Sequence, residues 1–519
     1  MNKTRIRTLF ITWLVLGIAT IMFSVPSFAA KKDRGPGEVV MVFKASHFSM
    51  TGGDPVTLVG AGQAVLPDPL FEGMAWTDPN KNALPGLAKS WKVAANWKYI
   101  DFELRKGVKF HNGDEVTAED FKYSWEAYMG RHGRSKFATR GILKRQIKQI
   151  EVQGPYKLRL HLNSPWPWWD VQLPWVMPKA YREKVGAKGF ADKPVGSGPF
   201  KWVDYKADTW VRLAAVKNHY RKTPGIKTIK LMAVPEHSTR LAMLKTGEAD
   251  IVGLIGPHIR QVRKNPKLRI KMLKDIQEQV LLYTDLAHPD KASPWHDKRV
   301  RIAASMAIDR KTITEKILFG LGTPTGEVIA PITKGFDPGV KTDPYNPEEA
   351  KRLLAEAGYP NGFKTVVTTK ATRKLFMQAI ASNLSDVGIQ VDFKVMENAA
   401  WNKALRNKKH QGLTHLASYF GGHTHVAKDG LTLFTTLTPW CYSTTPEIQK
   451  AIMKSMYAIS DEDKFKAGRQ ISKMIRDSRI RLPLWRNHTA MGMGPRIKSY
   501  VPIAGVPTPR NFESITLND

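Results

Sequence analysis

The sequence is poor in cysteine and in acidic residues. Cys441 is its sole cysteine among 519 residues, which excludes an intramolecular disulfide and a zinc site made of paired cysteines. Only 46 Asp and Glu stand against 80 Lys and Arg, giving a formal net charge of +34. Such a charge first suggests a nucleic-acid-binding protein. However, no nucleic-acid-binding motif is recognisable, and the Lys and Arg residues are scattered along the sequence. We therefore expect a solvated basic surface, whose electrostatic field could speed the capture of an acidic ligand.

Long hydrophobic runs are lacking after the N-terminus. Lys3, Arg5 and Arg7 precede an apolar run that ends near a small-x-small site, Ser27-Phe28-Ala29. This pattern predicts a signal peptide over residues 1–29 that is cleaved near Ala29, the alternative being an uncleaved membrane anchor. No later run is long enough to span a bilayer, and the position of Cys441 leaves no cysteine for a lipid anchor at the new N-terminus. We therefore expect export to the periplasm.

The most informative stretch covers residues 84–129. Residues 99–104 alternate apolar and polar side chains, as a half-buried strand does. After a Lys-Gly turn, a second strand is expected to begin at Val108. A helix is then expected after Thr117, which forms a capping-box pattern with Asp120.

The order of these segments resembles that of a known protein family. LPGLAKSW, the alternating strand, LRKGVKFHNGDEVTAEDF and the aromatic helix resemble the signature of the family 5 extracellular solute-binding proteins, which are receptors of ABC importers for dipeptides, oligopeptides, nickel and other solutes. PVGSGPFKWVDY and TIKLMAVPEHSTRLAMLKTGEADIV resemble further blocks of that family.

The resemblance implies an α/β fold of the type II periplasmic binding protein kind. Two lobes, the first with an extra subdomain, would be joined by two crossing strands around a ligand cleft. We expect the first lobe to comprise residues 30–282 and 484–519, and the second lobe to comprise residues 283–483. Two lobes that close on a ligand form a binding architecture.

Capping residues predict several other helices. Ser238, Asp297 and Asn346 are expected to cap helices, the last with proline at the first helical position. Residues 389–395 alternate as a strand, and the apolar RLPLWRN segment from Arg481 is expected to be the second crossing strand.

The resemblance also places part of the ligand site in the loop GGHTHVAKDG, which follows the strand LTHLASYF. Peptide-binding relatives carry an aspartate near the start of this loop that pairs with the α-ammonium of the ligand. The first carboxylate here is Asp429. Either Asp429 reaches the ligand from a shifted loop, or the ligand has no free ammonium there.

The candidate ligand-binding residues combine this loop with aromatic and basic residues elsewhere. Met74 and Trp76 are also candidates for core packing, and Trp401 for a helix face. His423 and His425 could share a metal ion, being two apart in an extended segment, or could hydrogen-bond a polar ligand. The full set is Met74, Trp76, Arg140, Trp401, Tyr419, Phe420, Gly422, His423, His425, Asp429 and Trp440.

We therefore predict a periplasmic receptor that captures a peptide or peptide-like small solute and delivers it to an inner-membrane ABC permease and its ATPase. We expect a monomer with no cofactor and no nucleic-acid partner. A receptor for a metal chelate or another non-peptide solute is the alternative. A secreted enzyme is a lesser one, because no metalloprotease helix or Gly-x-Ser-x-Gly elbow is present.

Overall fold

The computed structural model describes residues 35, 37–44, 53–57, 65–79, 82–137, 140–171, 173–418, 425–438, 440–503 and 510–518. Residues Gly37–Asp519 form one compact unit, and Met1–Pro36 form a separate one. The predicted signal peptide lies outside the described residues. Among the described helices, none combines the length and the apolar character needed to cross a membrane.

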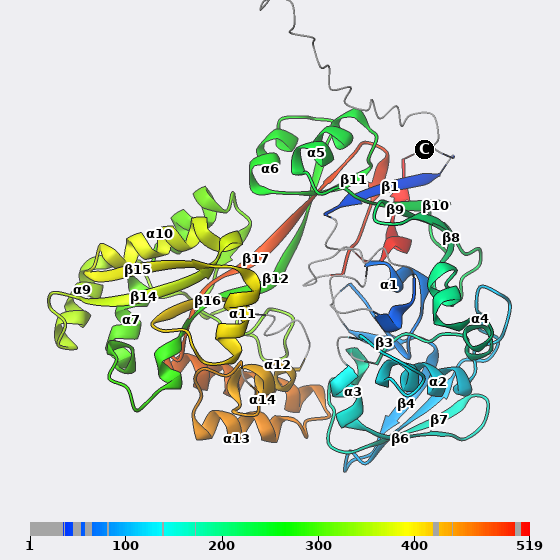
Figure 1. Ribbon diagram of the computed structural model, residues 1–519, viewed down its shortest axis with the longest axis horizontal. Coiled ribbons are helices and arrows are strands. Elements are labelled where there is room, and N and C mark those ends of the chain that lie inside the picture. Colours follow the sequence, from blue (N-terminus) through cyan, green and yellow to red (C-terminus); the bar gives the residue numbers. More distant parts are fainter. Residues whose placement is uncertain are drawn as a thin grey trace, which may run out of the picture. The chain divides into compact units, whose positions relative to one another are not determined.

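An 11-stranded mixed sheet runs through the compact unit (Figure 1). Its buried strands are rich in apolar residues; every residue of β1, for example, is buried between two parallel neighbours, β10 and β11. The strands in spatial order are β15 (Ile389–Met396), β14 (Phe363–Lys370), β16 (Leu413–Ser418), β12 (Arg269–Tyr283), β17 (Arg481–Met493), β11 (Ile251–Leu254), β1 (Glu38–Phe43), β10 (Thr228–Ala233), β9 (Trp210–Ala215) and β8 (Phe200–Lys206), and β13 (Gly322–Pro324) pairs with β17.

The two longest strands of this sheet, β12 and β17, pair antiparallel from Arg269↔Met493 to Leu282↔Arg481. The register shifts at two places, between Leu273 and Gln277 and again after Gln279, and such irregularities bend and twist a strand. The strand predicted from Arg481 is therefore confirmed as β17. The division into lobes at residues 282 and 484 stays a prediction.

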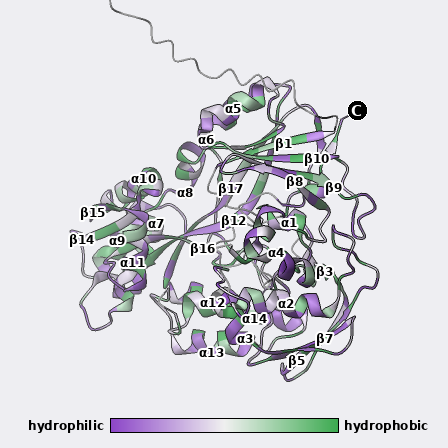
Figure 2. Ribbon diagram, turned by 45° about the vertical axis from the view of Figure 1, so that its right-hand side comes forward, coloured by the Kyte–Doolittle hydropathy of each residue, from purple (hydrophilic) through white to green (hydrophobic). Residues whose placement is uncertain are grey.

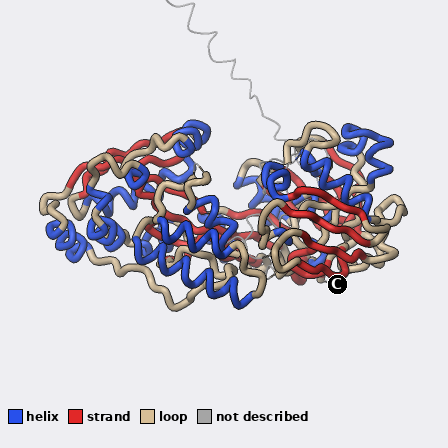
Figure 3. The backbone as a smooth tube through the Cα atoms, turned by 90° about the horizontal axis from the view of Figure 1, so that it is seen from below, coloured by secondary structure: helices blue, strands red, loops and turns tan. Residues whose placement is uncertain are grey.

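Helices pack beside the strands, as the blue and red segments of Figure 3 show. Most carry hydrophobic and hydrophilic residues together (Figure 2), so that one face is buried and the other solvated. Their bounds are α1 (Pro67–Leu70), α2 (Ala118–Met129), α3 (Arg140–Gln146), α4 (Lys179–Asp192), α5 (His237–Thr246), α6 (Gly256–Arg263), α7 (Lys298–Met306), α8 (Arg310–Thr312), α9 (Pro347–Glu356), α10 (Lys374–Ser385), α11 (Asn398–Arg406), α12 (Val426–Phe434), α13 (Pro446–Ser455) and α14 (Asp461–Ser478).

Two strands of the signature stretch join two later strands in a second sheet, against which α2 packs. Its strands are β4 (Ala88–Val93), β5 (Tyr99–Leu104), β7 (Lys157–Leu162) and β6 (Ile147–Val152), in that order. The capping box of Thr117 and Asp120 is confirmed at the start of α2. The prediction of a strand from Val108 is wrong. Both edges of β5 are already paired, with β4 and β7, and the segment that follows Val108 forms only an isolated bridge, Lys109↔Glu115.

Two small two-stranded sheets complete the described strands. They are β2 (Ala75–Thr77) with β3 (Ala83–Pro85), and β18 (Ile497–Ser499) with β19 (Thr516–Leu517).

Most predicted helix caps are confirmed. The carboxylate of Asp297 accepts a hydrogen bond from the backbone N–H of Arg299, and the side chain of Asn346 accepts one from Glu349. The prediction for Ser238 is wrong, because α5 begins at His237 and Glu236, two residues before Ser238, occupies the cap position.

Candidate functional site

A cavity of about 460 Å³ opens at the carboxyl ends of the parallel strands β14 and β16. In α/β sheets, ligands bind outside the carboxyl ends of parallel strands. The start of α11 and the segment after β14 form the other walls. The lining residues are Lys370, Ala371, Thr372, Arg373, Glu397, Asn398, Trp401, Asn402, His415, Leu416, Ala417 and Trp440. This set, the strand-end cavity, includes two of the predicted site residues, Trp401 and Trp440.

Trp401 forms the floor of the strand-end cavity. Its side chain is 2% exposed and its indole Nε1 donates to Thr414 Oγ1 at 3.0 Å. The Lys370 ammonium lies 4.1 Å from the centre of its ring, a cation–π contact. Trp401 is therefore both buried on its helix face and at the border of the cavity, and its contact with a ligand stays a prediction.

Two cations, Lys370 and Arg373, and one carboxylate, Glu397, line this cavity. Burial lowers the pKa of Lys370, and the Arg373 guanidinium lowers it further. Burial also holds the pKa of His415 well below its usual range, with Arg373 and Lys370 acting in the same direction. His415 is therefore neutral, and its Nε2 donates to Gln279 Oε1 at 2.9 Å. The lining carboxylate, Glu397, is exposed.

Sequence reasoning missed these basic residues. The signal was present, because TTKATRK places three cations, two of which line the cavity, just where β14 ends and α10 begins. His415 was hidden because a histidine within a strand gives no sign of which end of the sheet it faces.

The loop after β16 falls mainly outside the described residues. Tyr419, Phe420, Gly422 and His423 lie there, so their predicted roles stay predictions. Asp429 is part of α12, but its side chain is outside the described part of the chain.

His425 is buried at the start of α12. Its Nδ1 accepts a hydrogen bond from the backbone N–H of Ala427 at 3.0 Å, which caps the helix. Burial lowers its pKa to about 3, Lys464 lowers it further, and the carbonyls of Ser455 and Ala458 oppose the shift. The neutral ring therefore carries its proton on Nε2, and Nδ1 is already used. Across the described residues, no group of three His, Cys, Asp or Glu side chains could hold a metal ion.

His425 also touches an aromatic loop far away in sequence. Its ring centre lies 6.3 Å from that of Trp168, which is 3% exposed. Ala427 and Met456 join the same hydrophobic core as this tryptophan. The start of α12 and the tryptophan-rich loop are thus packed against each other.

The other predicted residues lie elsewhere. Met74 is 1% exposed within the core, and Arg140 is exposed at the start of α3. Trp76 is half-buried in β2 and stacks on Arg221, whose guanidinium lies 4.7 Å from its ring centre. The structure does not bring these three into the strand-end cavity.

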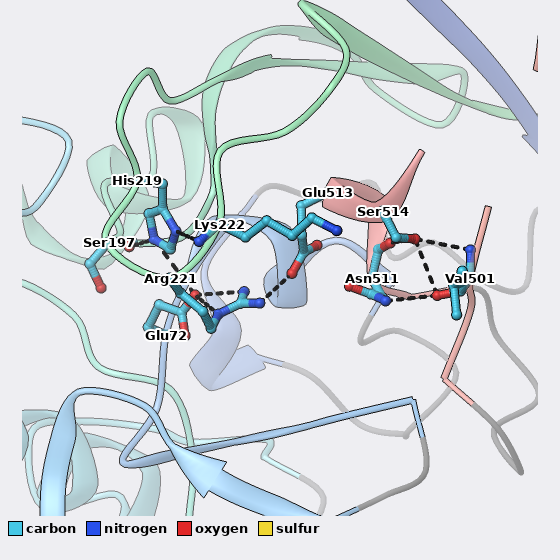
Figure 4. A network of polar contacts seen from close by, with 9 residues as sticks. All are labelled: Glu72, Ser197, His219, Arg221, Lys222, Val501, Asn511, Glu513 and Ser514. Atoms are coloured by element: carbon cyan, nitrogen blue, oxygen red, sulfur yellow. Dashed lines mark hydrogen bonds and ion pairs between the residues drawn. The ribbon is translucent and has the colours of Figure 1, made fainter. Parts of the chain in front are cut away.

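Arg221 joins two buried carboxylates beside a cavity of about 160 Å³ (Figure 4). Its guanidinium donates to Glu72 Oε1 at 2.9 and 3.1 Å and to Glu513 Oε1 at 2.6 Å. Burial raises the pKa of Glu72 although Arg221 opposes it. Burial also works against the charge of Arg221, but Glu72 and Glu513 together hold its pKa above the usual value. This network ties the C-terminal segment to β2 and its neighbours.

A third cavity, of about 730 Å³, lies beside β12. Residues 271–275 of β12, the loop 331–336, Phe465 of α14 and residues 501–503 line it together with Pro79 and Asn82. Its walls come from both sides of the paired long strands.

Comparisons with known proteins agree with this architecture. A family model described as bacterial extracellular solute-binding proteins, family 5 Middle, matches residues 82–430. Heme-binding protein A of Haemophilus influenzae is 24% identical over 80% of this chain and 81% of its own length. Di/tripeptide-binding protein 2 of Pseudomonas aeruginosa is 27% identical over 66% of this chain and 68% of its own.

The solved structure of HbpA2 from Haemophilus parasuis is similar to this chain, with a TM-score of 0.82 and 19% sequence identity. The alignment covers 93% of this chain and 100% of HbpA2. Similarity at this level of identity concerns the fold. The predicted α/β fold of the type II periplasmic binding protein kind is confirmed.

Proposed function

Because the chain belongs to the family 5 bacterial extracellular solute-binding proteins, we propose that it is the periplasmic receptor of an ABC importer. It captures a peptide or peptide-like small solute between two lobes and delivers it to an inner-membrane permease and its ATPase. It acts as a monomer, without a cofactor, and releases its solute unchanged rather than acting as an enzyme.

The lobes of this proposal are residues 30–282 with 484–519, and residues 283–483. The pairing of β12 with β17 supports it, because the chain passes from one part to the other only along these two neighbouring strands within the described residues. Residues 1–29 are the signal peptide, cleaved near Ala29.

The strand-end cavity supports a solute that carries an anionic group. Burial and the neighbouring Arg373 guanidinium lower the pKa of Lys370 at the cavity wall, and a negative charge placed there would be stabilised by both cations. The aromatic floor of Trp401 suits a flat or apolar body next to that charge. This positive, aromatic-floored cavity is the observation that carries the proposal.

A peptide meets these demands through its terminal carboxylate, and the name of the Pseudomonas relative favours that class. The name of the Haemophilus relative favours a larger non-peptide solute, so a carboxylate-bearing non-peptide remains the second candidate. A metal chelate is less favoured, because Nδ1 of His425 already caps α12.

Native mass spectrometry of the protein purified from its own periplasm tests the proposal, since a receptor of this kind retains its solute. Titration followed by tryptophan fluorescence then compares dipeptides, their C-terminal amides, sugars and nickel–histidine. We expect saturable binding of solutes with a free carboxylate, weak binding of the amides, and no product. Turnover of a solute, or equal binding of acid and amide, would contradict the proposal.

Lys370→Met gives a residue-level test. Losing a charge-assisted hydrogen bond is expected to weaken binding of a carboxylate solute about tenfold, with no effect on solutes that lack an anionic group. Lys374→Met is the matched control, because Lys374 is exposed at the start of α10 and does not line the cavity. Equal effects of both variants would show that the strand-end cavity is not where the solute binds.

A further inference from the structure

One segment of the chain combines many cations with a complete lack of acids. No Asp or Glu occurs between Glu126 and Glu151, whereas this stretch contains Arg131 and six further cations. The six lie on the loop after α2, on α3 and at the start of β6 (Figure 1). We call them the α3 basic surface: Arg134, Lys136, Arg140, Lys144, Arg145 and Lys148.

All six side chains are exposed. Arg131, just outside the set, pairs with Glu126 at 3.0 Å. None of the six has an ion pair or an aromatic partner among the described residues. Arg140 and Lys144 lie one turn apart on α3, where like charges repel and destabilise a helix. The charges are therefore not explained by contacts within the protein.

The backbone beneath these cations is well fixed. Leu143 and Gln146 are buried and hold α3 in place. In the loop, Ser135 Oγ donates to the carbonyl of Tyr128 at 2.8 Å and accepts from the N–H of Phe137 at 3.2 Å. The cations are thus presented on a structured surface.

Other segments also lack acids, for example residues 209–235, 251–274, 398–428 and 478–512, and residues 251–274 show how the charges of such a segment can be used within the fold. There the guanidinium of Arg260 lies 5.1 Å from the ring centre of Phe319, and Arg269 donates to the carbonyls of Ile497 and Lys498. Part of its charge is used within the fold, whereas that of the α3 basic surface is directed to solvent.

The chemistry around the α3 basic surface indicates what it meets. Among the described residues from 85 to 202, no large hydrophobic side chain is exposed. A protein partner would need buried aromatic or aliphatic anchors, and a single-stranded nucleic acid would need aromatic side chains for its bases. A layer of acidic lipid headgroups offers negative phosphates and needs neither. Clusters of four to eight Lys and Arg are typical of binding to such a layer.

We propose that the α3 basic surface docks the protein on the anionic surface of a phospholipid bilayer. This interaction is separate from solute capture, because these residues do not line the strand-end cavity. It would concentrate the protein at a membrane surface without a covalent anchor. Attraction of this kind falls off within a Debye length, about 8 Å at physiological salt, so only cations on the facing surface contribute strongly.

Sedimentation with vesicles tests the proposal on the full mature chain. The vesicles are phosphatidylcholine with or without phosphatidylglycerol, in buffer of ~150 mM ionic strength. We expect binding only to vesicles that contain phosphatidylglycerol, and weaker binding as salt rises. Each cation near the surface strengthens binding about fivefold. The variant Arg134→Gln, Lys136→Gln, Arg140→Gln, Lys144→Gln should therefore bind at least about 20-fold more weakly, even if only two of the four cations contact headgroups.

The control variant removes the same charge from exposed lysines elsewhere that have no ion pair among the described residues: Lys188→Gln, Lys206→Gln, Lys311→Gln, Lys316→Gln. Its binding should change less than about threefold, because distant charges are screened. Equal losses in the two variants would show an effect of net charge alone and overturn the proposal. So would failure of the wild-type chain to bind phosphatidylglycerol vesicles better than phosphatidylcholine vesicles. The pairs Arg134→Gln with Lys136→Gln and Arg140→Gln with Lys144→Gln keep the test decisive if the fourfold variant does not fold.

Discussion

The arginine between two buried carboxylates allows a demanding test of the structure. In Arg221→Met, a side chain of similar length keeps the packing but removes the charge. The side chains of Arg221, Glu72 and Glu513 are only 13%, 3% and 6% exposed. Removing one partner of a buried ion pair costs about 3–5 kcal/mol, because a buried charge is left uncompensated. We expect a loss of that size in the free energy of unfolding at pH 8.

The loss should depend on pH, and its sign follows from the carboxyls. Burial already raises the pKa of Glu72, and Arg221 is the main group that opposes this rise. Without Arg221 the folded-state pKa rises further above the unfolded value. The variant then takes up a proton on folding as the pH falls and regains stability. The difference from wild type should therefore be largest at pH 8 and smaller at pH 5.

Urea unfolding followed by circular dichroism at both pH values measures these differences. Arg352→Met is the control, because Arg352 makes only exposed pairs with Glu349 and Glu356 on α9. It should leave the unfolding midpoint unchanged at either pH, since exposed pairs contribute little. A loss below about 1 kcal/mol for Arg221→Met, or a loss of equal size at pH 5 and pH 8, would refute the reasoning.

Three further predictions concern contacts elsewhere in the fold. The variant His425→Asn keeps a capping side chain but does not titrate. The pKa of His425 is about 3 in the folded protein and near 6.5 in the unfolded chain. Below pH 6.5, the free energy of unfolding of the wild type should therefore fall relative to that of the variant by about 1.4 kcal/mol per pH unit, as measured by acid unfolding curves. Trp168→Ala should lower the free energy of unfolding by about 3 kcal/mol or more, as measured by thermal unfolding, and should weaken solute binding. A loss of stability without weaker binding would show that the loop does not affect the site. Gly362→Ala should lower the free energy of unfolding in urea by more than about 2 kcal/mol. The φ of Gly362 is +72°, and an added Cβ would clash with the carbonyl oxygen of Gly388. A variant with the same urea midpoint as the wild type would show that this turn can relax.

Local signals in the sequence predicted local structure well. The capping box at Thr117, the caps at Asp297 and Asn346 and the strand 389–395 depend on neighbours within a few residues. The strand expected from Val108 failed because strand pairing is decided by distant partners, and β5 already has β4 and β7 on its two edges.

The site was harder to predict, for a related reason. Trp401 and Trp440 were recognised by residue type, but the cations beside them were not. Lys370 and Arg373 become a site only because β14 and β16 are parallel neighbours, which brings their carboxyl ends together. Arg140 was assigned to the solute as an isolated cation, whereas in the fold it is one of a group on α3.

The pairing of Leu282 with Arg481 has a practical consequence. The chain leaves β12 and returns to β17 at adjacent points, so the two ends of the intervening segment, about two hundred residues long, lie one strand spacing apart, about 5 Å. A two-residue turn could bridge that distance. The segment could accordingly be exchanged with that of a relative without lengthening the chain at the junction, provided that the pairing of its β16 with β12 is kept.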